Sequence, residues 1–502
     1  MDKITDMIQT IDQWAIHDAD RVVYQSDTQT FTYGDLKAKS DSVAAYLLNE
    51  VQVDGPVVVY GGQEFEMLAT FVGCSKAGRA YIPIETHTPQ ERLSMIIDVA
   101  EPALIIYMDQ WVDLETKAEV VQMNTIPEYQ LEQYPGLKDD DTYYIIFTSG
   151  TTGVPKGVQI SHANLRSFVN WELNDFNLKE GERFLSQAPF SFDLSVMSLY
   201  PALALGGSLA PLTKETINDF KKLFATLPTM NLNVWVSTPS FMDICLMEPT
   251  FDAKHNPTLT HFLFCGEELP RQTAIKLKER FPEAYLYNTY GPTEATVAVT
   301  RINVTEQVLE DYNRIPIGYP KEDTKIIIMD HDLNPLPAGE MGEIIIVGPS
   351  VSKGYLHNEA KTKEVFFEYE GERAYHTGDA GRLTEDGLLL YGGRMDFQIK
   401  LHGYRMELED IDHHLNEVSY ISQAAAVPKY KDGKVQQLIA YVVPKDNPFE
   451  KDYQLTKAIK QELAETVMDY MIPQRFIYVD HLALTQNGKI DRKGLINEVN
   501  NG

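Results

Sequence analysis

The sequence has 502 residues, of which 43% are hydrophobic and 10% aromatic. This composition supports a globular protein, and the length predicts at least two domains because single cores rarely grow so large. The formal charge of −29 at pH 7 excludes a broad nucleic-acid-binding surface, which needs clustered Lys and Arg. It is typical of a freely diffusing monomer.

Three widely spaced cysteines, Cys74, Cys245 and Cys265, predict neither a disulfide framework nor a zinc site. This usage suits a reducing compartment. Residues 1–8 lack a cationic segment followed by an apolar core, and no run of about 18 apolar residues occurs. We therefore expect a cytoplasmic protein without a signal peptide and without membrane insertion.

Between about residues 55 and 270, strand-like runs alternate with helical patterns. Predicted strands cover residues 56–60, 103–107, 233–236 and 261–264, and a predicted amphipathic helix covers 64–77. Such alternation indicates parallel βαβ units with helices on both faces of the sheet.

A loop rich in Gly, Ser and Thr occupies residues 147–158, Phe-Thr-Ser-Gly-Thr-Thr-Gly-Val-Pro-Lys-Gly-Val. It follows a predicted buried strand at 143–147 and precedes a predicted helix capped by Ser161. This arrangement offers backbone N–H groups and hydroxyls to a phosphate, and Lys156 adds a positive charge. The spacing differs from that of a Walker A loop. A solvated turn is the alternative, but twelve consecutive residues of this composition favour a nucleotide loop.

Residues 288–294, Asn-Thr-Tyr-Gly-Pro-Thr-Glu, form a second motif. Its Tyr can stack on a base, its Asn can pair with an adenine edge, and its Thr can bind a phosphate. Glu294 is a hard oxygen ligand of the kind that Mg²⁺ prefers. A turn followed by a helix N-terminus explains the same residues equally well.

Two aspartates lie in weaker motifs. Asp379, beside Gly378, can accept hydrogen bonds from two ribose hydroxyls, although an Asx-turn is the alternative. If residues 192–197 are helical, Asp193 and Met197 share one face, which suits a small ligand with an ammonium group. A helix-capping aspartate explains Asp193 equally well.

The pattern changes after residue 315. Short predicted strands at 325–329, 343–347 and 388–391, separated by Gly and Pro, indicate a small barrel or twisted antiparallel sheet. From about residue 397, helices at 407–415 and 455–464 and strands at 424–427 and 438–443 predict a compact α+β unit. Lys489 follows an Asn-Gly turn near the end of the chain; such a lysine is normally solvated and matters only if its loop reaches the nucleotide.

In this order, these segments resemble the adenylate-forming superfamily, which includes acyl-CoA synthetases, luciferases and the adenylation domains of peptide synthetases. The resemblance extends from residues 31–33 to the loop of Lys489. It implies an α/β fold with a large N-terminal domain of βαβ sheets (1–394), whose part at about 315–394 is β-barrel-like. It also implies a small mobile α+β lid (397–502) and a hinge at 395–396, with Asp396 absorbing the backbone change.

The resemblance also implies roles for individual residues. Phosphate contacts fall to Thr148, Ser149, Thr152 and Lys156; adenine contacts to Asn288 and Tyr290; the α-phosphate to Thr293; the metal to Glu294; and the ribose to Asp379 and Arg394. Further nucleotide contacts fall to Thr289, Gly291, Pro292, Tyr391, Gly392 and Gly393. Leu194, Met197, Cys265 and Val297 would line the substrate pocket, with Asp193 on the substrate ammonium. Lys489, catalytic together with Glu294, would bridge the substrate carboxylate and the nucleotide.

The resemblance is closest to members that activate D-alanine, through residues 191–194 and 264–267. It implies that ATP and Mg²⁺ form D-alanyl-adenylate, and that the alanyl group passes to the phosphopantetheine thiol of a D-alanyl carrier protein for D-alanylation of lipoteichoic acid. This is an AMP-forming ligase reaction that makes a carbon–sulfur bond. We expect the carrier to come as a separate chain, because the sequence ends soon after Lys489.

Three alternatives stay open at this point. One is an adenylation enzyme for another small amino acid. A second is an acyl-CoA synthetase, against which Asp193 argues, because a fatty-acid pocket has no use for a buried carboxylate. The third is a non-catalytic nucleotide-binding protein, which the combination of Lys489, Glu294 and Asp379 disfavours.

Overall fold

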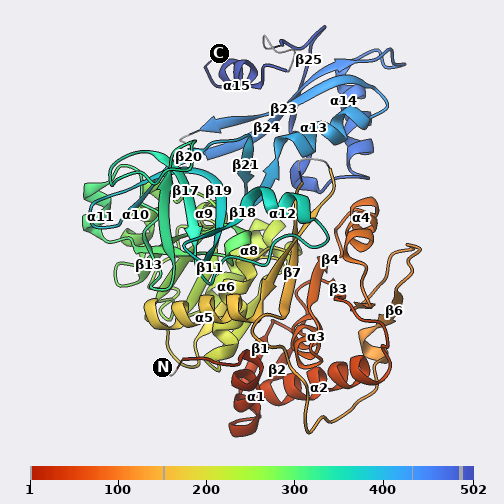
Figure 1. Ribbon diagram of the computed structural model, residues 1–502, viewed down its shortest axis with the longest axis vertical. Helices are drawn as coiled ribbons and strands as arrows, with labels where there is room; N and C mark the ends of the chain where they lie inside the picture. The colour runs from red at the N-terminus through yellow and green to blue at the C-terminus, as the bar shows by residue number, and fades with distance from the viewer. Residues whose placement is uncertain (1–2, 151–152, 432–433, 485–489, 502) are drawn as a thin grey trace. The chain divides into compact units, whose positions relative to one another are not determined.

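The computed structural model describes residues 3–150, 153–431, 434–484 and 490–501. The chain forms two compact units (Figure 1). Unit 1 comprises residues 1–86, 100–146 and 157–395, and unit 2 comprises residues 87–99, 147–156 and 396–502. Among the described residues, no helix has both the length and the apolar character needed to cross a bilayer.

A six-stranded sheet provides the first layer of unit 1. Its order is β6-β5-β3-β4-β7-β8. The bounds are β3 (Val57–Gly61), β4 (Tyr81–Glu85), β5 (Leu104–Tyr107), β6 (Glu119–Gln122), β7 (Thr142–Thr148) and β8 (Lys156–Ser161). Strands β3 to β6 pair in parallel, and β3 lies between β4 and β5, so the predicted parallel βαβ arrangement is confirmed.

A nine-stranded sheet provides the second layer, in the order β15-β14-β13-β12-β11-β9-β10-β1-β2. Its strands are β1 (Val22–Gln25), β2 (Thr30–Thr32), β9 (Arg183–Ser186), β10 (Ser208–Pro211), β11 (Val234–Ser237), β12 (His261–Phe264), β13 (Tyr285–Tyr290), β14 (Thr300–Asn303) and β15 (Tyr319–Pro320). The central strands pair in parallel, whereas β13 and β14 pair in an antiparallel manner and reverse the chain directly after Tyr290.

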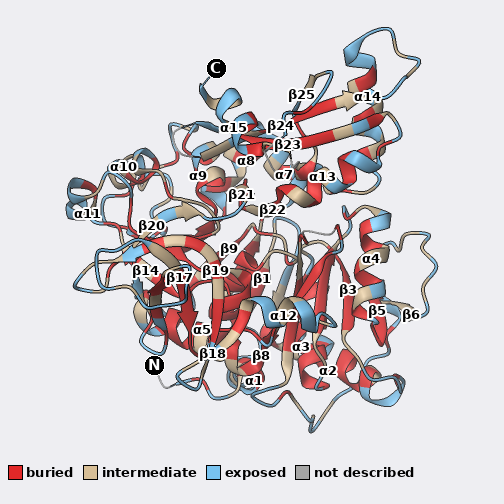
Figure 2. Ribbon diagram, turned by 45° about the horizontal axis from the view of Figure 1, so that its top comes forward, coloured by how far each residue is buried: buried red, intermediate tan, exposed pale blue. Residues whose placement is uncertain are grey.

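Helices cover both sheets of unit 1. They are α1 (Met7–His17), α2 (Tyr33–Asn49), α3 (Phe65–Lys76), α5 (His162–Asp175), α6 (Leu194–Ala204), α7 (Lys214–Asn218), α8 (Phe220–Thr226), α9 (Pro239–Cys245), α10 (Arg271–Arg280), α11 (Glu306–Asp311) and α12 (Glu359–Val365). The sequence explains their starts: Ser161 caps α5 by accepting from the Asn164 N–H, as predicted. Figure 2 shows the strands largely buried and α11 largely exposed.

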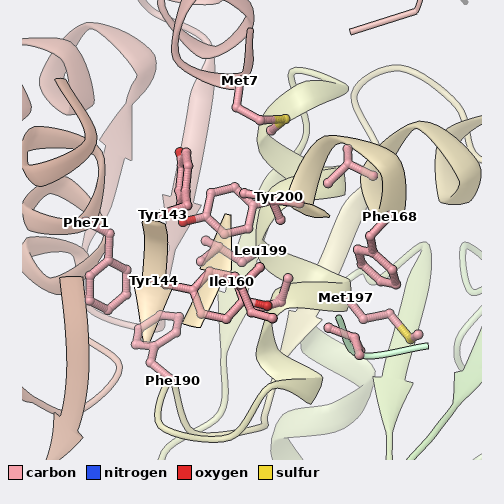
Figure 3. Close-up of a cluster of buried hydrophobic side chains, with 14 of the residues drawn as sticks. Met7, Phe71, Tyr143, Tyr144, Ile160, Phe168, Phe190, Met197, Leu199 and Tyr200 are labelled. Atoms are coloured by element: carbon pink, nitrogen blue, oxygen red, sulfur yellow. The ribbon is translucent and has the colours of Figure 1, made fainter. Parts of the chain in front are cut away.

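Aromatic side chains fill the core between these elements. Figure 3 shows Tyr143 and Tyr144 of β7 close to Phe71 of α3 and Tyr200 of α6. The Tyr200 hydroxyl lies 2.7 Å from the hydroxyl of Tyr81, so these buried polar atoms satisfy each other.

The predicted small β region is an antiparallel sheet in the order β16-β17-β19-β18, with β20 paired to β19. Its strands are β16 (Lys325–Met329), β17 (Gly342–Val347), β18 (Phe366–Tyr369), β19 (Glu372–Leu383) and β20 (Leu389–Arg394). The register between β17 and β19 shifts between Glu343 and Ile345. Such irregularities re-aim nearby side chains, and this one lies opposite the part of β19 that carries Asp379.

Unit 2 is an α+β unit, as predicted. It contains the hairpin of β21 (Gln398–Leu401) and β22 (Tyr404–Glu407) and a three-stranded sheet of β23 (Ile421–Lys431), β24 (Lys434–Pro444) and β25 (Arg475–Tyr478). Its helices are α13 (Leu408–Glu417), α14 (Asp452–Leu463), α15 (Arg492–Asn501) and most of α4 (Gln90–Ala100). His402 and Gly403 connect the hairpin with positive φ angles of 53° and 86°, as a two-residue turn requires.

Candidate active site

The loop that follows β13 is tightly packed. A Cβ on Gly291 would lie 2.6 Å from the Ala298 Cα, so only glycine fits there. Two β-branched residues of the same loop, Thr296 and Val297, have left-handed φ angles of 58° and 67°. A left-handed conformation costs about 1–2 kcal/mol for such a residue, and strain of this kind concentrates at functional sites.

Contacts around this loop hold the strained backbone in place. The Thr296 hydroxyl donates to the Ser350 carbonyl at 2.7 Å. The Cys265 thiol, at the end of β12, donates to the Val297 carbonyl with an Sγ–O distance of 3.6 Å. Two predicted substrate-pocket residues from different loops therefore touch each other.

Hydrogen bonds fix the start of the second motif. The Asn288 amide is buried and its Nδ2 donates to the Pro316 carbonyl at 2.8 Å. The Thr289 hydroxyl donates to the Phe264 carbonyl at 2.8 Å. Because Nδ2 is engaged, the Asn288 carbonyl oxygen is the atom suited to accept from an adenine amino group.

Asp379 is the centre of a cluster of hydrogen bonds. Its Oδ2 accepts from the Tyr290 hydroxyl at 2.6 Å, and its Oδ1 accepts from the Tyr391 hydroxyl at 3.1 Å and from Arg394 NH1 at 3.1 Å. Three predicted nucleotide-binding residues, Tyr290, Tyr391 and Arg394, thus donate hydrogen bonds to a fourth, Asp379. The carboxylate is held by side chains from other strands, and a ribose has to share or replace these donors.

The electrostatics of this cluster keep both tyrosines protonated. Burial, and then the charge of Asp379, raise the pKa values of Tyr290 and Tyr391 far above the usual tyrosine range. Both phenols therefore remain donors at physiological pH. Thr377 fixes the backbone beside them, because its hydroxyl accepts from the Asp379 N–H at 3.0 Å.

Glu294 lies in a short 3₁₀ helix, η3 (Thr293–Ala295), and is fully buried. Its Oε1 accepts from the Tyr355 hydroxyl at 2.7 Å. Within the described part of the chain, no group of three or more His, Cys, Asp or Glu side chains is placed to hold a metal. A carboxylate of this kind fits Mg²⁺, which commonly takes one or two carboxylates and completes its shell with phosphate oxygens and water.

Asp193 stands at the N-cap position of α6, is 7% exposed, and makes no capping hydrogen bond with its side chain. The alternative of a capping aspartate is therefore wrong. The residues predicted to line the substrate pocket, Leu194, Met197, Cys265 and Val297, are all buried. Figure 3 shows Met197 of α6 near Phe168 of α5.

The sequence did not point to Tyr144, a further residue near Asp193. Burial, followed by the charge of Asp193, raises the pKa of Tyr144 far above its ordinary value. Among the described residues, the Tyr144 hydroxyl has no hydrogen-bond partner. Its position in an apolar run gave no signal beyond a strand, and the same holds for Tyr355 in its loop.

Most of the predicted phosphate loop, residues 147–156, belongs to unit 2 and contacts β22 of that unit. The Ser149 hydroxyl donates to the Arg405 carbonyl at 3.2 Å and accepts from the Glu407 N–H at 3.3 Å. Lys156 Nζ lies 3.7 Å from Glu407 Oε1. A phosphate bound to Ser149 and Lys156 has to compete with these groups.

Of the other predicted site residues of unit 2, the structure describes some and not others. The Thr148 hydroxyl is buried without a hydrogen-bond partner in the described chain, which suits a phosphate oxygen. Asp396 is the first residue of the C-terminal segment of unit 2, and its Oδ1 accepts from the Gln398 N–H at 3.0 Å. Thr152 and Lys489 lie outside the described residues.

Family models identify the class of protein that this fold and site define. The model of the AMP-binding enzyme matches residues 11–356, and that of the AMP-binding enzyme C-terminal domain matches residues 410–489. The chain therefore belongs to the AMP-binding enzyme family, whose adenylate-forming fold has the large and small parts predicted above.

Within this family, the chain is similar over its full length to individual ligases. The chain is 55% identical over 510 residues to the D-alanine–D-alanyl carrier protein ligase of Lactiplantibacillus plantarum, covering 99% of both sequences. It is 53% identical over 509 residues to the ligase of the same name from Streptococcus agalactiae, covering 99% of this chain and 100% of the relative.

Solved structures agree in fold. An NRPS protein containing adenylation and PCP domains has a TM-score of 0.82 at 25% identity, covering 98% of this chain and 84% of that one. The Vibrio cholerae adenylation domain AlmE, in complex with glycyl-adenosine-5′-phosphate, has a TM-score of 0.81 at 22% identity, covering 98% and 96%.

Proposed function

We propose that this protein activates D-alanine with ATP and transfers the alanyl group to the phosphopantetheine thiol of a separate D-alanyl carrier protein. The observation that carries this proposal is the 55% identity, over 99% of both chains, to a D-alanine–D-alanyl carrier protein ligase. The carrier stage would supply D-alanine for lipoteichoic acid. We place the reaction in the cytoplasm, where ATP is available, and assign it to a monomer.

In the first half-reaction, the carboxylate of D-alanine attacks the α-phosphorus of ATP and pyrophosphate leaves. The two reactants are both anions, so the main requirement is electrostatic. Asp193 would hold the substrate ammonium, and Asn288 and Asp379 would hold the adenosine. When bound at Glu294, Mg²⁺ would offset the charge of the phosphates. Lys489 would bridge the reacting carboxylate and the nucleotide.

In the second half-reaction, a thiol sulfur attacks the carbonyl carbon of the mixed anhydride, a thioester forms and AMP leaves. The residues that guide this step would lie on the C-terminal lid, which we assign to residues 397–502, following a large domain of residues 1–394. A hinge at 395–396, at which Asp396 changes its backbone angles, would rotate the lid between the two half-reactions. The lid residues that serve the first half-reaction would then be replaced by those that serve the second.

The pocket composition supports a small substrate with an ammonium group. Asp193 is a buried carboxylate, and a substrate ammonium can form an ion pair with it whereas a fatty acid cannot, so an amino acid is favoured over a fatty acid. The long side chains of Leu194 and Met197 limit the volume beyond it.

The decisive experiment is ATP–pyrophosphate exchange with D-alanine, L-alanine, glycine, D-serine and acetate, each with and without Mg²⁺. We expect Mg²⁺-dependent exchange with D-alanine well above the others. Preferential exchange with glycine or L-alanine would show that the substrate assignment is wrong but that the proposed adenylation chemistry is right. Exchange with acetate alone would refute the role of Asp193. Intact-mass analysis of a phosphopantetheinylated carrier then tests the thiol step.

A further inference from the structure

Arg314 makes a set of contacts that the proposed reaction does not yet use. It lies between α11 and β15 in unit 1. Its Nε donates to Oε1 of Glu268 at 2.9 Å and its NH2 donates to Oε2 at 2.6 Å, so the pair is bidentate. Its NH1 donates to the Tyr391 carbonyl at 3.0 Å, and the guanidinium lies 5.0 Å from the Tyr391 ring centroid.

These contacts differ from those of an ordinary surface ion pair. The side chains of Arg314 and Glu268 are 45% and 28% exposed, and an exposed pair alone contributes little to stability. Here, however, the two parallel hydrogen bonds orient the guanidinium plane. The oriented guanidinium contacts both the backbone carbonyl and the ring of Tyr391. Arg314 therefore holds this residue of β20 in a fixed orientation.

Tyr391 connects this arrangement to the predicted ribose site. Its hydroxyl donates to Asp379 Oδ1 at 3.1 Å, and its ring centroid lies 6.1 Å from that of Tyr290. Glu268, at the other end, follows Cys265 by three residues in the loop after β12. A continuous path of contacts therefore runs from the loop after β12, through Arg314, to the carboxylate of Asp379.

We propose that Arg314 is a positioning residue for the ribose of the nucleotide, acting through Tyr391 on Asp379, and that Glu268 holds Arg314 in place. A Tyr391 fixed before binding keeps the Asp379 carboxylate oriented toward the two ribose hydroxyls, which lowers the ordering cost of binding. This inference rests on the proposed function, because it needs ATP as the ligand of Asp379.

The test uses Arg314→Ala, Arg314→Lys and Glu268→Gln in the full-length protein. We expect Arg314→Ala to raise KM for ATP and Kd for AMP by about 5–10-fold, which corresponds to about 1–1.4 kcal/mol, because Arg314 acts on the ribose only through Tyr391 and Asp379. The KM for D-alanine and kcat should change less than about 2-fold, as expected for a residue that affects ground-state binding of one substrate. Arg314→Lys should resemble Arg314→Ala, because lysine lacks the planar fork.

A ribose-specific readout separates positioning from general destabilisation. With 2′,3′-dideoxy-ATP, which lacks both hydroxyls, wild type and Arg314→Ala should show nearly equal KM values. The matched control is Lys325→Ala, which breaks an exposed ion pair with Glu372 at 2.6 Å in the same unit and should change neither KM.

Three results would overturn the proposal. One is an unchanged KM for ATP in Arg314→Ala, the second is an equal loss with ATP and the dideoxy analogue, and the third is a wild-type-like Glu268→Gln. Failure of the proposed function looks different: wild type would show no exchange with D-alanine. AMP binding by calorimetry, with wild type and each variant, still tests Arg314 in that case.

Discussion

The Tyr290 hydroxyl donates a 2.6 Å hydrogen bond to Oδ2 of Asp379, joining residues 89 positions apart in the chain. Tyr290 comes from the motif at 288–294 and Asp379 comes from strand β19. Their contact places two separately predicted nucleotide-binding segments in one buried cluster of unit 1.

Replacement of Asp379 by Asn tests this cluster. Asn keeps the shape but removes the charge that attracts Arg394 and strengthens hydrogen bonds from ribose. We expect KM for ATP to rise about 10-fold or more, because hydrogen bonds to a charged group contribute roughly 1.5–3 kcal/mol. Steady-state exchange kinetics measure this. The control is Asp386→Asn, an exposed aspartate bonded to Tyr319; an equal change in both variants would contradict the assignment.

Glu294 is the predicted metal ligand, and Glu294→Gln removes its charge. We expect about 100-fold lower kcat and a higher Mg²⁺ concentration for half-maximal rate, because the charge developing at the phosphates loses its counter-ion. Titration of the exchange rate with Mg²⁺ measures both. Tyr355→Phe, which removes the 2.7 Å hydrogen bond but keeps the carboxylate, is the control. An unchanged Mg²⁺ dependence in Glu294→Gln would remove this residue from the metal site.

The substitution Asp193→Asn should weaken binding of the amino-acid substrate and leave binding of ATP unchanged. The variant leaves the substrate ammonium buried without a carboxylate, so we expect KM for D-alanine to rise about 100-fold while KM for ATP stays within a factor of about two. Helix α6 should be unaffected, since Asp193 makes no capping hydrogen bond. Asp219→Asn, which changes a true cap of α8, is the control. A rise in KM for ATP alone would contradict the ammonium role.

Cys265→Gly tests the chirality of the pocket. The thiol donates to the Val297 carbonyl at 3.6 Å, so its removal vacates space beside a strained backbone position. We expect L-alanine to be admitted and the D/L ratio of kcat/KM to fall about 10-fold or more, in line with the effect of one methyl-sized group. Cys245→Gly, at another buried cysteine, should leave the ratio unchanged. The same ratio in wild type and Cys265→Gly would show that other residues select the enantiomer.

The lowered pKa of His261 leads to a prediction of how the stability of the protein depends on pH. Burial lowers the pKa of this histidine, at the start of β12, to about 4 from an ordinary value of 6.5. The unfolded chain therefore binds more protons between pH 6.5 and 4, and stability is lost as pH falls through that window, by up to about 3 kcal/mol. His261→Phe keeps the stacking on Tyr285 but cannot titrate. Its apparent Tm should fall less steeply than that of wild type over this range, and an equally steep fall in both would contradict the prediction.

Elements with strong local patterns were predictable from the sequence. The alternating apolar runs gave β3, β5, β16 and β17 almost to the residue, and the Ser161 cap marked the start of α5. These features depend on the periodicity and propensity of neighbouring residues, which the sequence displays directly. The ordered motifs also identified the family, because side-chain chemistry at fixed spacing survives large changes elsewhere.

The tertiary structure decided which of the motif residues meet. Tyr290, Tyr391 and Arg394 converge on Asp379, and Arg314 reaches both Glu268 and Tyr391, because strands and loops from different parts of the chain pack together. It also decided the left-handed backbone of Thr296 and Val297, which local preference opposes and only packing can hold. The sequence by itself determined the chemical groups and the secondary structure; their mutual geometry follows from long-range packing, which no local pattern encodes.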